Sequence, residues 1–340
     1  MPAFICETCG SQFTPSDAPP RSCPICEDER QFVPPGGQRW TTLDALARRH
    51  FNCYQQHESG LIGVGTVPKF SIGQRALVLR AGEGNILWDC IPFIDAATVE
   101  IVKGLGGLAG IAISHPHYYA TMVEWSRAFG GVPIHLHAAD RQWIMRPDPA
   151  IKLWEGDTLP LAREITLIRC GGHFAGGTVL HWAAGGEGRG ALLSGDIVQL
   201  IPDRKYVSFM RSYPNIIPLS APAVARIGAV LEPWPFDVIY GAFFDRVIAR
   251  GGKDAVRRSV KRYIAIYRGR RHGGAGLTKA RLRPRSRRGT GPRPYAAAAS
   301  HRVPGTLGDR RVFCRLSRRM AVGSGLCRDR DLRRHRSVDA

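Results

Sequence analysis

The chain has 340 residues, of which 44% are hydrophobic, and a formal net charge of +20. This length and composition allow a large buried core together with a small accessory unit. No run of about 18 apolar residues occurs, and the N-terminal sequence lacks the basic and apolar parts of a secretory signal, so we expect no membrane span and no export. A cytoplasmic location follows, in which the nine cysteines serve as thiols or metal ligands rather than disulfides.

The first predicted unit, residues 1–35, contains two Cys-x-x-Cys pairs. Cys6 and Cys9 form the first pair, and Cys23 and Cys26 form the second. Two such pairs at short separation can place four thiolates tetrahedrally around one ion, and the metal then supplies the folding energy that so small a unit lacks. The pattern resembles a zinc ribbon or a rubredoxin-like knuckle. Zinc is expected, although a four-cysteine site also accepts iron.

Residues 40–267 are predicted to alternate between strands and helices, as in an α/β (α+β) domain. Strands are predicted at 75–80, 85–90, 108–114, 133–137, 164–170, 178–183, 190–194 and 237–240. Helices are predicted at 97–105, 119–129 and 253–267, the last with an apolar stripe that begins at Val256.

Four possible metal ligands follow predicted strands in this domain. His115 and His117 lie two residues apart, so on an extended segment both imidazoles point to the same side. His173 lies in a glycine-rich turn after the strand at 164–170, and Asp196 follows the strand at 190–194. Three histidines and one aspartate suit zinc or, with open positions, non-heme iron.

The order of these residues resembles that of the metallo-β-lactamase-fold superfamily. The pair His115-x-His117, the later His173 and Asp196 in Ser-Gly-Asp carry the resemblance, and Leu87-Trp-Asp89-Cys90 is similar to an early motif of that family. Over about residues 40–267 the chain looks closest to uncharacterised members that have an N-terminal metal-binding knuckle. The resemblance implies an αββα sandwich with its site at one edge, between the two sheets.

The chain departs from this family at three positions. In this chain, Tyr119 and Ala120 occupy the positions of the last Asp and His of the family motif HxHxDH. Ala242 follows Gly241 at the position where the family has a late histidine. In dinuclear members these three residues serve the second metal. The resemblance therefore implies one metal, held by His115, His117 and His173, with Asp196 as the fourth ligand or as a water-orienting base.

Further residues are candidates for roles around that metal. Asp196 and Tyr119 are expected to handle protons, while Tyr118, Arg211 and Tyr213 are candidates for contact with substrate. His135 and His137 are also two residues apart, but the family pattern does not use them, and we expect them not to bind the metal.

Three functions remain open on this sequence. The first is a single-metal hydrolase that activates water to attack an ester, thioester or amide carbonyl of a small molecule. The second is a mononuclear iron oxygenase or redox protein that acts on a sulfur compound, with iron at either site. The third is a non-catalytic binding module. The sequence does not indicate the oligomeric state.

The last segment, residues 268–340, carries most of the net charge. It has 21 Lys and Arg against 4 Asp and Glu, so the rest of the chain has a balance of only +3. Such a composition predicts a disordered Arg-rich tail that binds nucleic acid weakly at most. Only one of the 21 cations is a lysine, and Arg, Ala, Gly and Pro dominate, which is also typical of a GC-rich gene translated out of frame.

Overall fold

The computed structural model describes residues 1–82 and 84–267. The expected Arg-rich tail, residues 268–340, lies outside this range. All described residues belong to one compact unit. None of the helices within residues 1–82 and 84–267 has the length and apolar character needed to cross a membrane.

The first half of the main domain forms a seven-stranded sheet with its strands in chain order. Its members are β3 (Phe51–Glu58), β4 (Leu61–Val67), β5 (Ala76–Ala81), β6 (Gly84–Trp88), β7 (Gly110–Ala112), β8 (Ile134–His137) and β9 (Ile151–Trp154). The pairs from β3 to β6 are antiparallel, whereas β6, β7, β8 and β9 run parallel to one another. The carboxyl ends of β6 and β7 consequently lie at the same edge of the sheet.

The second half forms a six-stranded sheet, in the order β10-β11-β12-β13-β18-β19. These strands are β10 (Thr158–Ala162), β11 (Ile165–Arg169), β12 (Thr178–Trp182), β13 (Ala191–Gly195), β18 (Val238–Gly241) and β19 (Val247–Ile248). Only β13 and β18 pair in parallel.

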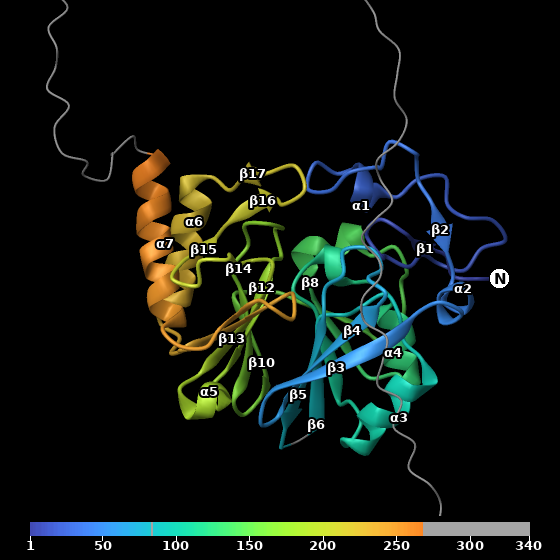
Figure 1. Ribbon diagram of the computed structural model, residues 1–340, viewed down its shortest axis with the longest axis horizontal. Helices are drawn as coiled ribbons and strands as arrows, with labels where there is room; N and C mark the ends of the chain where they lie inside the picture. Colours follow the sequence, from blue (N-terminus) through green and yellow to red (C-terminus); the bar gives the residue numbers. More distant parts are fainter. Residues whose placement is uncertain (83, 268–340) are drawn as a thin grey trace, which may run out of the picture. The chain divides into compact units, whose positions relative to one another are not determined.

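Two helical layers cover the outer faces of the two sheets (Figure 1). Helices α3 (Ala96–Gly104) and α4 (Met122–Ala128) share a core cluster with the first sheet, and α6 (Ala221–Leu231) and α7 (Gly252–Tyr267) share one with the second. A third cluster, which includes Leu77, Trp88, Leu180 and Leu193, joins the inner faces of the two sheets. These layers form an αββα sandwich, as the resemblance implied.

The prediction of a helix at 119–129 was wrong about its first turn. Instead, a short 3₁₀ helix, η1 (Pro116–Tyr118), follows β7, and α4 begins only at Met122. Between them Ala120 has a φ of 42°, a left-handed conformation that interrupts helical hydrogen bonding. The sequence patterns also missed β3, β4, β9, β10 and α6. The other predicted strands and helices occur within a few residues of their expected bounds.

The N-terminal ribbon contains β1 (Ile5–Cys6) and α1 (Pro24–Glu27), with β2 (Trp40–Thr41) and α2 (Leu43–Ala47) just after it. It is hydrogen-bonded to the main domain, because the Gln12 amide N–H donates to Ala120 O at 3.1 Å. The Arg146 guanidinium also donates to Gln12 Oε1 and Glu124 Oε1. The division into a ribbon (1–35) and a main domain (40–267) remains a prediction from composition.

Smaller elements fill the connections. They are η2 (Ala138–Trp143), α5 (Gly185–Gly188) and two short hairpins, β14 (Gln199–Leu200) with β15 (Val207–Ser208) and β16 (Met210–Ser212) with β17 (Ile217–Pro218). The β16–β17 hairpin extends toward the ribbon beside α1 (Figure 1).

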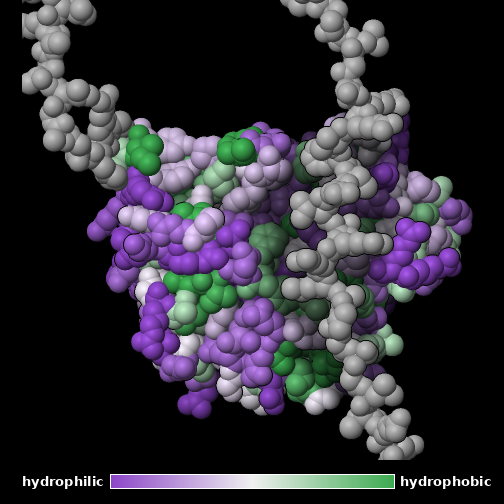
Figure 2. Space-filling model, viewed as in Figure 1, coloured by the Kyte–Doolittle hydropathy of each residue, from purple (hydrophilic) through white to green (hydrophobic). Residues whose placement is uncertain are grey.

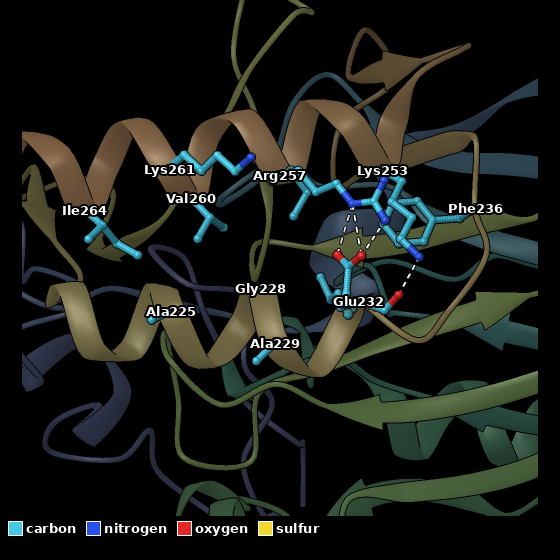
Figure 3. A pocket seen from close by; sticks show the side chains of 12 residues that line it. Ala225, Gly228, Ala229, Glu232, Phe236, Lys253, Arg257, Val260, Lys261 and Ile264 are labelled. Atoms are coloured by element: carbon cyan, nitrogen blue, oxygen red, sulfur yellow. Dashed lines mark hydrogen bonds and ion pairs between the residues drawn. The ribbon is translucent and has the colours of Figure 1, made fainter. Parts of the chain in front are cut away.

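A groove of 340 Å³ runs between α6 and α7. The apolar side chains that line it include those of Phe236, Val256 and Val260. The ion pair between Arg257 and Glu232 lies at one end (Figure 3). None of the residues predicted to form the functional site lines this groove. On the face drawn in Figure 2, polar side chains predominate and the apolar patches are scattered, which is usual for a globular domain.

Candidate metal centre

His115 and His117 lie just beyond the end of β7, at the edge where the two sheets meet. The Asp89 carboxylate, after β6, accepts a hydrogen bond from the Ser114 amide at 2.7 Å. From the second sheet, the Thr178 amide donates to Ser114 O at 2.9 Å. Both histidines are therefore carried by a backbone segment that is tied to both sheets.

His173 comes from the glycine-rich loop between β11 and β12. Its Nδ1 donates to the carbonyl of Met210 at 3.2 Å, which leaves Nε2 without a proton and available as a ligand. In the same loop, the Gly176 amide donates to Asp140 Oδ1 at 2.9 Å. The loop is thus held from both sides, and His173 has a defined ring orientation.

The three histidines form one group in which the possible ligand atoms lie within 4.8 Å of one another. His117 Nδ1 and His173 Nε2 are 3.2 Å apart. The Nδ1 of His115 is hydrogen-bonded to Ser114 Oγ at 2.8 Å, and its buried Nε2 has no hydrogen-bond partner. Two zinc-bound nitrogens in a tetrahedral site are about 3.3 Å apart, so these residues fit a zinc-sized ion.

Burial keeps these imidazoles neutral. It lowers the pKa of His115 and of His117 well below the usual range and lowers the pKa of His173 to about 4. Neutral imidazole is the form that binds metals, so the group is ready to do so at neutral pH without releasing protons.

Asp196 lies next to the histidine group but is not a member of it. Its Oδ2 is 3.9 Å from His115 Nε2, and its buried Oδ1 has no hydrogen-bond partner. Burial raises the pKa of this carboxyl to about 6, and the hydrogen bond from Tyr118 opposes the shift. This position suits both predicted roles of Asp196, a base beside the metal and a fourth ligand.

Tyr118, rather than Tyr119, is the tyrosine in contact with Asp196. The Tyr118 hydroxyl donates to Asp196 Oδ2 at 2.7 Å, and its ring centroid is 4.4 Å from that of His115. Tyr119 is buried in the core cluster of the first sheet. Tyr118 is therefore the tyrosine that lies where the predicted proton-handling role requires one, because the 3₁₀ turn Pro116–Tyr118 directs its phenol toward Asp196.

The positions that would serve a second metal lie in an apolar environment. Tyr119, Ala120 and Ala242 all belong to the core cluster of the first sheet. Within the described parts of the chain, the groups of three or more possible ligands are this histidine group and the ribbon cysteines.

The two other substrate candidates have different surroundings. The Tyr213 hydroxyl donates to the carbonyl of Asp196 at 2.7 Å, so Tyr213 supports the site directly. The Arg211 guanidinium pairs with Glu29 of the ribbon at 2.5 Å, and its contact with substrate stays a prediction. His137 Nε2 donates to Gly156 O at 3.1 Å, and its Nδ1 accepts from the Ala139 amide at 3.1 Å. Neither His135 nor His137 is in a group of three or more possible ligands.

Sequence patterns missed two residues that close the site. Phe174 packs its ring 4.9 Å from His117 and 5.1 Å from His173, and the Arg30 guanidinium carbon lies 4.0 Å from the Phe174 ring centroid. Phe174 could have been noticed as the neighbour of His173. Arg30 could not, because only the fold brings the ribbon to this loop.

The ribbon cysteines form the second group of ligands. Cys6, Cys9, Cys23 and Cys26 are all buried, with Sγ atoms within 4.8 Å of one another. Cys6 and Cys26 are 3.6 Å apart, and Cys9 and Cys23 are 3.7 Å apart. Sulfur atoms around a tetrahedral zinc are about 3.8 Å apart, so the four thiols fit the expected structural site.

Comparison with known proteins gives one relative of high identity. The protein named "Uncharacterized protein YmaE" of Bacillus subtilis (strain 168) is 46% identical over 266 residues, which is 78% of this chain and 96% of that protein. No family model matches the chain.

Among solved structures, VMB-1 has a TM-score of 0.48 at 11% identity, over 64% of this chain and 98% of its own. The mono-zinc form of the metallo-β-lactamase FIM-1 from Pseudomonas aeruginosa has a TM-score of 0.48 at 12% identity, over 63% of this chain and 96% of its own.

The family follows from the sequence match, and the fold from the two sheets, their outer helices and the histidine group between them. The chain belongs to the family of B. subtilis YmaE, and its main domain has the αββα fold of the metallo-β-lactamase superfamily, preceded by a four-cysteine knuckle.

Proposed function

We propose that the protein is a metal-dependent hydrolase with a single-metal site, which acts on an ester, thioester or amide carbonyl. The observation that carries this proposal is the convergence of three neutral imidazoles beside a buried carboxylate that has one unpartnered oxygen. A divalent metal such as zinc at this site would supply Lewis acidity, which lowers the pKa of water and polarises a carbonyl.

The residues around the histidines divide the remaining work. Asp196 is the proton acceptor for the attacking water, since its Oδ1 is free while Oδ2 is held by Tyr118. Tyr118 keeps the carboxylate oriented and, because burial and the Asp196 charge raise its pKa, remains a proton donor at neutral pH. Ser114 and Met210 O hold the rings of His115 and His173.

The iron oxygenase alternative has less support. It requires two histidines and one carboxylate as ligands, whereas the group of mutually close donors here contains three histidines and not Asp196. Action on a small molecule, a cytoplasmic location and the weak nucleic-acid binding of the tail remain proposals from the sequence.

The test compares His115→Ala with His135→Ala on a panel of esters, thioesters and amides. We expect His115→Ala to lose one metal per chain and at least about 100-fold in kcat/KM, because it removes a ligand that orients the reaction. His135→Ala, which lies outside both ligand groups, should keep the metal and the activity. Metal-loaded protein without turnover on any substrate of the panel would contradict the proposal.

A further inference from the structure

Arg30 connects the ribbon to the histidine group. Its Nη1 donates to the carbonyl of His173 at 3.4 Å, and its guanidinium lies over the ring of Phe174. The Phe174 ring in turn lies against the rings of His115, His117 and His173. The Phe174 ring therefore lies between the Arg30 guanidinium and the three predicted histidine ligands.

The cysteine knuckle determines where Arg30 lies. Cys26 is in α1, and the amide of Asp28, just after α1, donates to Pro24 O at 3.2 Å. The Asp28 carboxylate then accepts from Arg30 three times, from the backbone amide at 2.9 Å, from Nε at 2.5 Å and from Nη2 at 2.8 Å. Only three residues separate Cys26 from Arg30, so an ion that fixes α1 also fixes this turn.

The β16–β17 hairpin holds the same turn from the opposite side. Ser212 Oγ donates to Arg30 O at 3.1 Å, and Asn215 Nδ2 donates to the carbonyls of Glu29 and Gln31, each at 2.9 Å. Met210 of this hairpin accepts from His173. One short hairpin therefore positions both the turn that carries Arg30 and the ring of a predicted ligand.

These contacts leave the histidines closed to solvent. His115 and His173 are each 1% exposed, His117 is 3% exposed, and Arg30 itself is 9% exposed. We propose that the metal of the four-cysteine ribbon controls how firmly the three-histidine site retains its own metal, with Arg30 as the positioning residue. With the ribbon loaded, Arg30 lies on Phe174 and holds the histidines in place; without the ribbon metal, the turn loosens and the histidine-bound metal is released faster. This proposal goes beyond hydrolysis and needs only that both groups bind metal.

The experiment uses the full chain loaded with cobalt(II). Cobalt bound by thiolates shows strong sulfur-to-metal charge-transfer absorption that a histidine site lacks, so each ion is followed separately. Release to an excess of EDTA is measured for wild type, Arg30→Ala and Arg30→Lys, and for Cys26→Ser. The matched control is Arg21→Ala, which removes an exposed arginine of the same ribbon.

We expect Arg30→Ala to keep the thiolate-bound cobalt but to release the histidine-bound cobalt at least about tenfold faster than wild type, as loss of a supporting contact commonly does. Arg30→Lys should be intermediate, since it keeps the charge but not the paired hydrogen bonds. Cys26→Ser should lose the ribbon metal and show the same fast release. Arg21→Ala should behave as wild type.

If Arg30→Ala releases its histidine-bound cobalt at the wild-type rate, the proposal is overturned. Faster release in Cys26→Ser would not rescue it, because unfolding of the ribbon alone could cause that release. Wild type that binds only one cobalt, at the cysteines, would overturn it together with the proposed function. If the release rates follow the expected pattern but no ester, thioester or amide is turned over, only the proposed hydrolase function is contradicted.

Discussion

At the scale of single residues, the site depends on hydrogen bonds that set the orientation and charge of its side chains. Ser114 and Met210 O orient two imidazoles, and Tyr118 orients the Asp196 carboxylate. Ser114 and Tyr118 are buried, so the loss of either partner leaves a polar group without compensation.

Tyr118→Phe should reduce kcat/KM by about 10- to 100-fold, because it removes the only hydroxyl that holds Asp196 Oδ2 among the described residues. Metal content should stay unchanged, since Tyr118 is not in the ligand group. The matched control is Tyr119→Phe, whose hydroxyl belongs to a side chain of the core cluster. Equal effects of the two substitutions would contradict the assignment of the proton-handling role to Tyr118.

Asp140 provides a pH-dependent contribution to stability away from the ligands. Burial raises the pKa of this carboxyl from 3.8 to about 6, with the Gly176 amide and the charges of Arg30 and Arg169 acting against the shift. Between about pH 4 and pH 6 the folded state therefore binds more protons than the unfolded state, and stability falls as the pH rises.

Asp140→Asn should remove this part of the pH dependence. Its size is about 3 kcal/mol at most, from roughly two pKa units at about 1.4 kcal/mol each. Urea unfolding of wild type and variant at several pH values between 4 and 6 measures it. A variant that keeps the wild-type slope would show that another group causes the dependence.

At the scale of elements, loops and short turns bring the ligands together at the ends of regular strands. The glycine-rich loop after β11 carries His173 and lies against η2, where Asp140 is located. A Cβ atom at Gly176 would lie 2.7 Å from Asp140 Oδ2 and 2.9 Å from His137 Cβ, so the loop can approach η2 this closely only with glycine there.

Gly176→Ala should therefore displace the His173 loop. We expect metal affinity at the histidine site to fall by about 10- to 100-fold, as for other losses of ligand support, while the ribbon keeps its metal. Isothermal titration with zinc measures both. Gly36→Ala is the control, because a Cβ there meets nothing within 4 Å. Unchanged affinity in Gly176→Ala would mean that the loop accommodates the methyl group without moving His173.

At the scale of the molecule, the ribbon and the main domain belong to one compact unit. Buried or partly buried polar contacts join them, among them Gln12 with Ala120 and Arg146, and Arg30 with His173. Besides its cysteines, the ribbon buries only a few apolar side chains, Ile5, Phe13 and Ile25, so its folding requires either metal or these contacts.

Thermal unfolding of the metal-loaded chain should consequently show a single transition. Tryptophan fluorescence, which reports mainly on the sandwich, and the thiolate absorption of the cobalt-loaded ribbon should change at the same temperature. Removal of the ribbon metal should lower the midpoint of the fluorescence transition by several degrees. Two separate transitions would show that residues 1–35 fold independently of the main domain.

The sequence determined the parts of this protein that local chemistry specifies. The two Cys-x-x-Cys pairs and the histidines after β7 and β11 were predicted from their spacing along the chain, and the structure brings each set together within 4.8 Å. Regular strands such as β12 and β13 were predictable from their apolar patterns. The resemblance supplied the αββα arrangement of the two sheets, which spacing along the chain does not give.

Only the tertiary structure decided which side chains surround the ligands. Tyr118 and Tyr119 are adjacent and chemically identical, and the 3₁₀ turn with the left-handed Ala120 determines which of them reaches Asp196. Arg30 is 143 residues from His173 in sequence, and no local pattern predicts their contact. Such contacts depend on packing between distant segments, which local residue preferences do not encode.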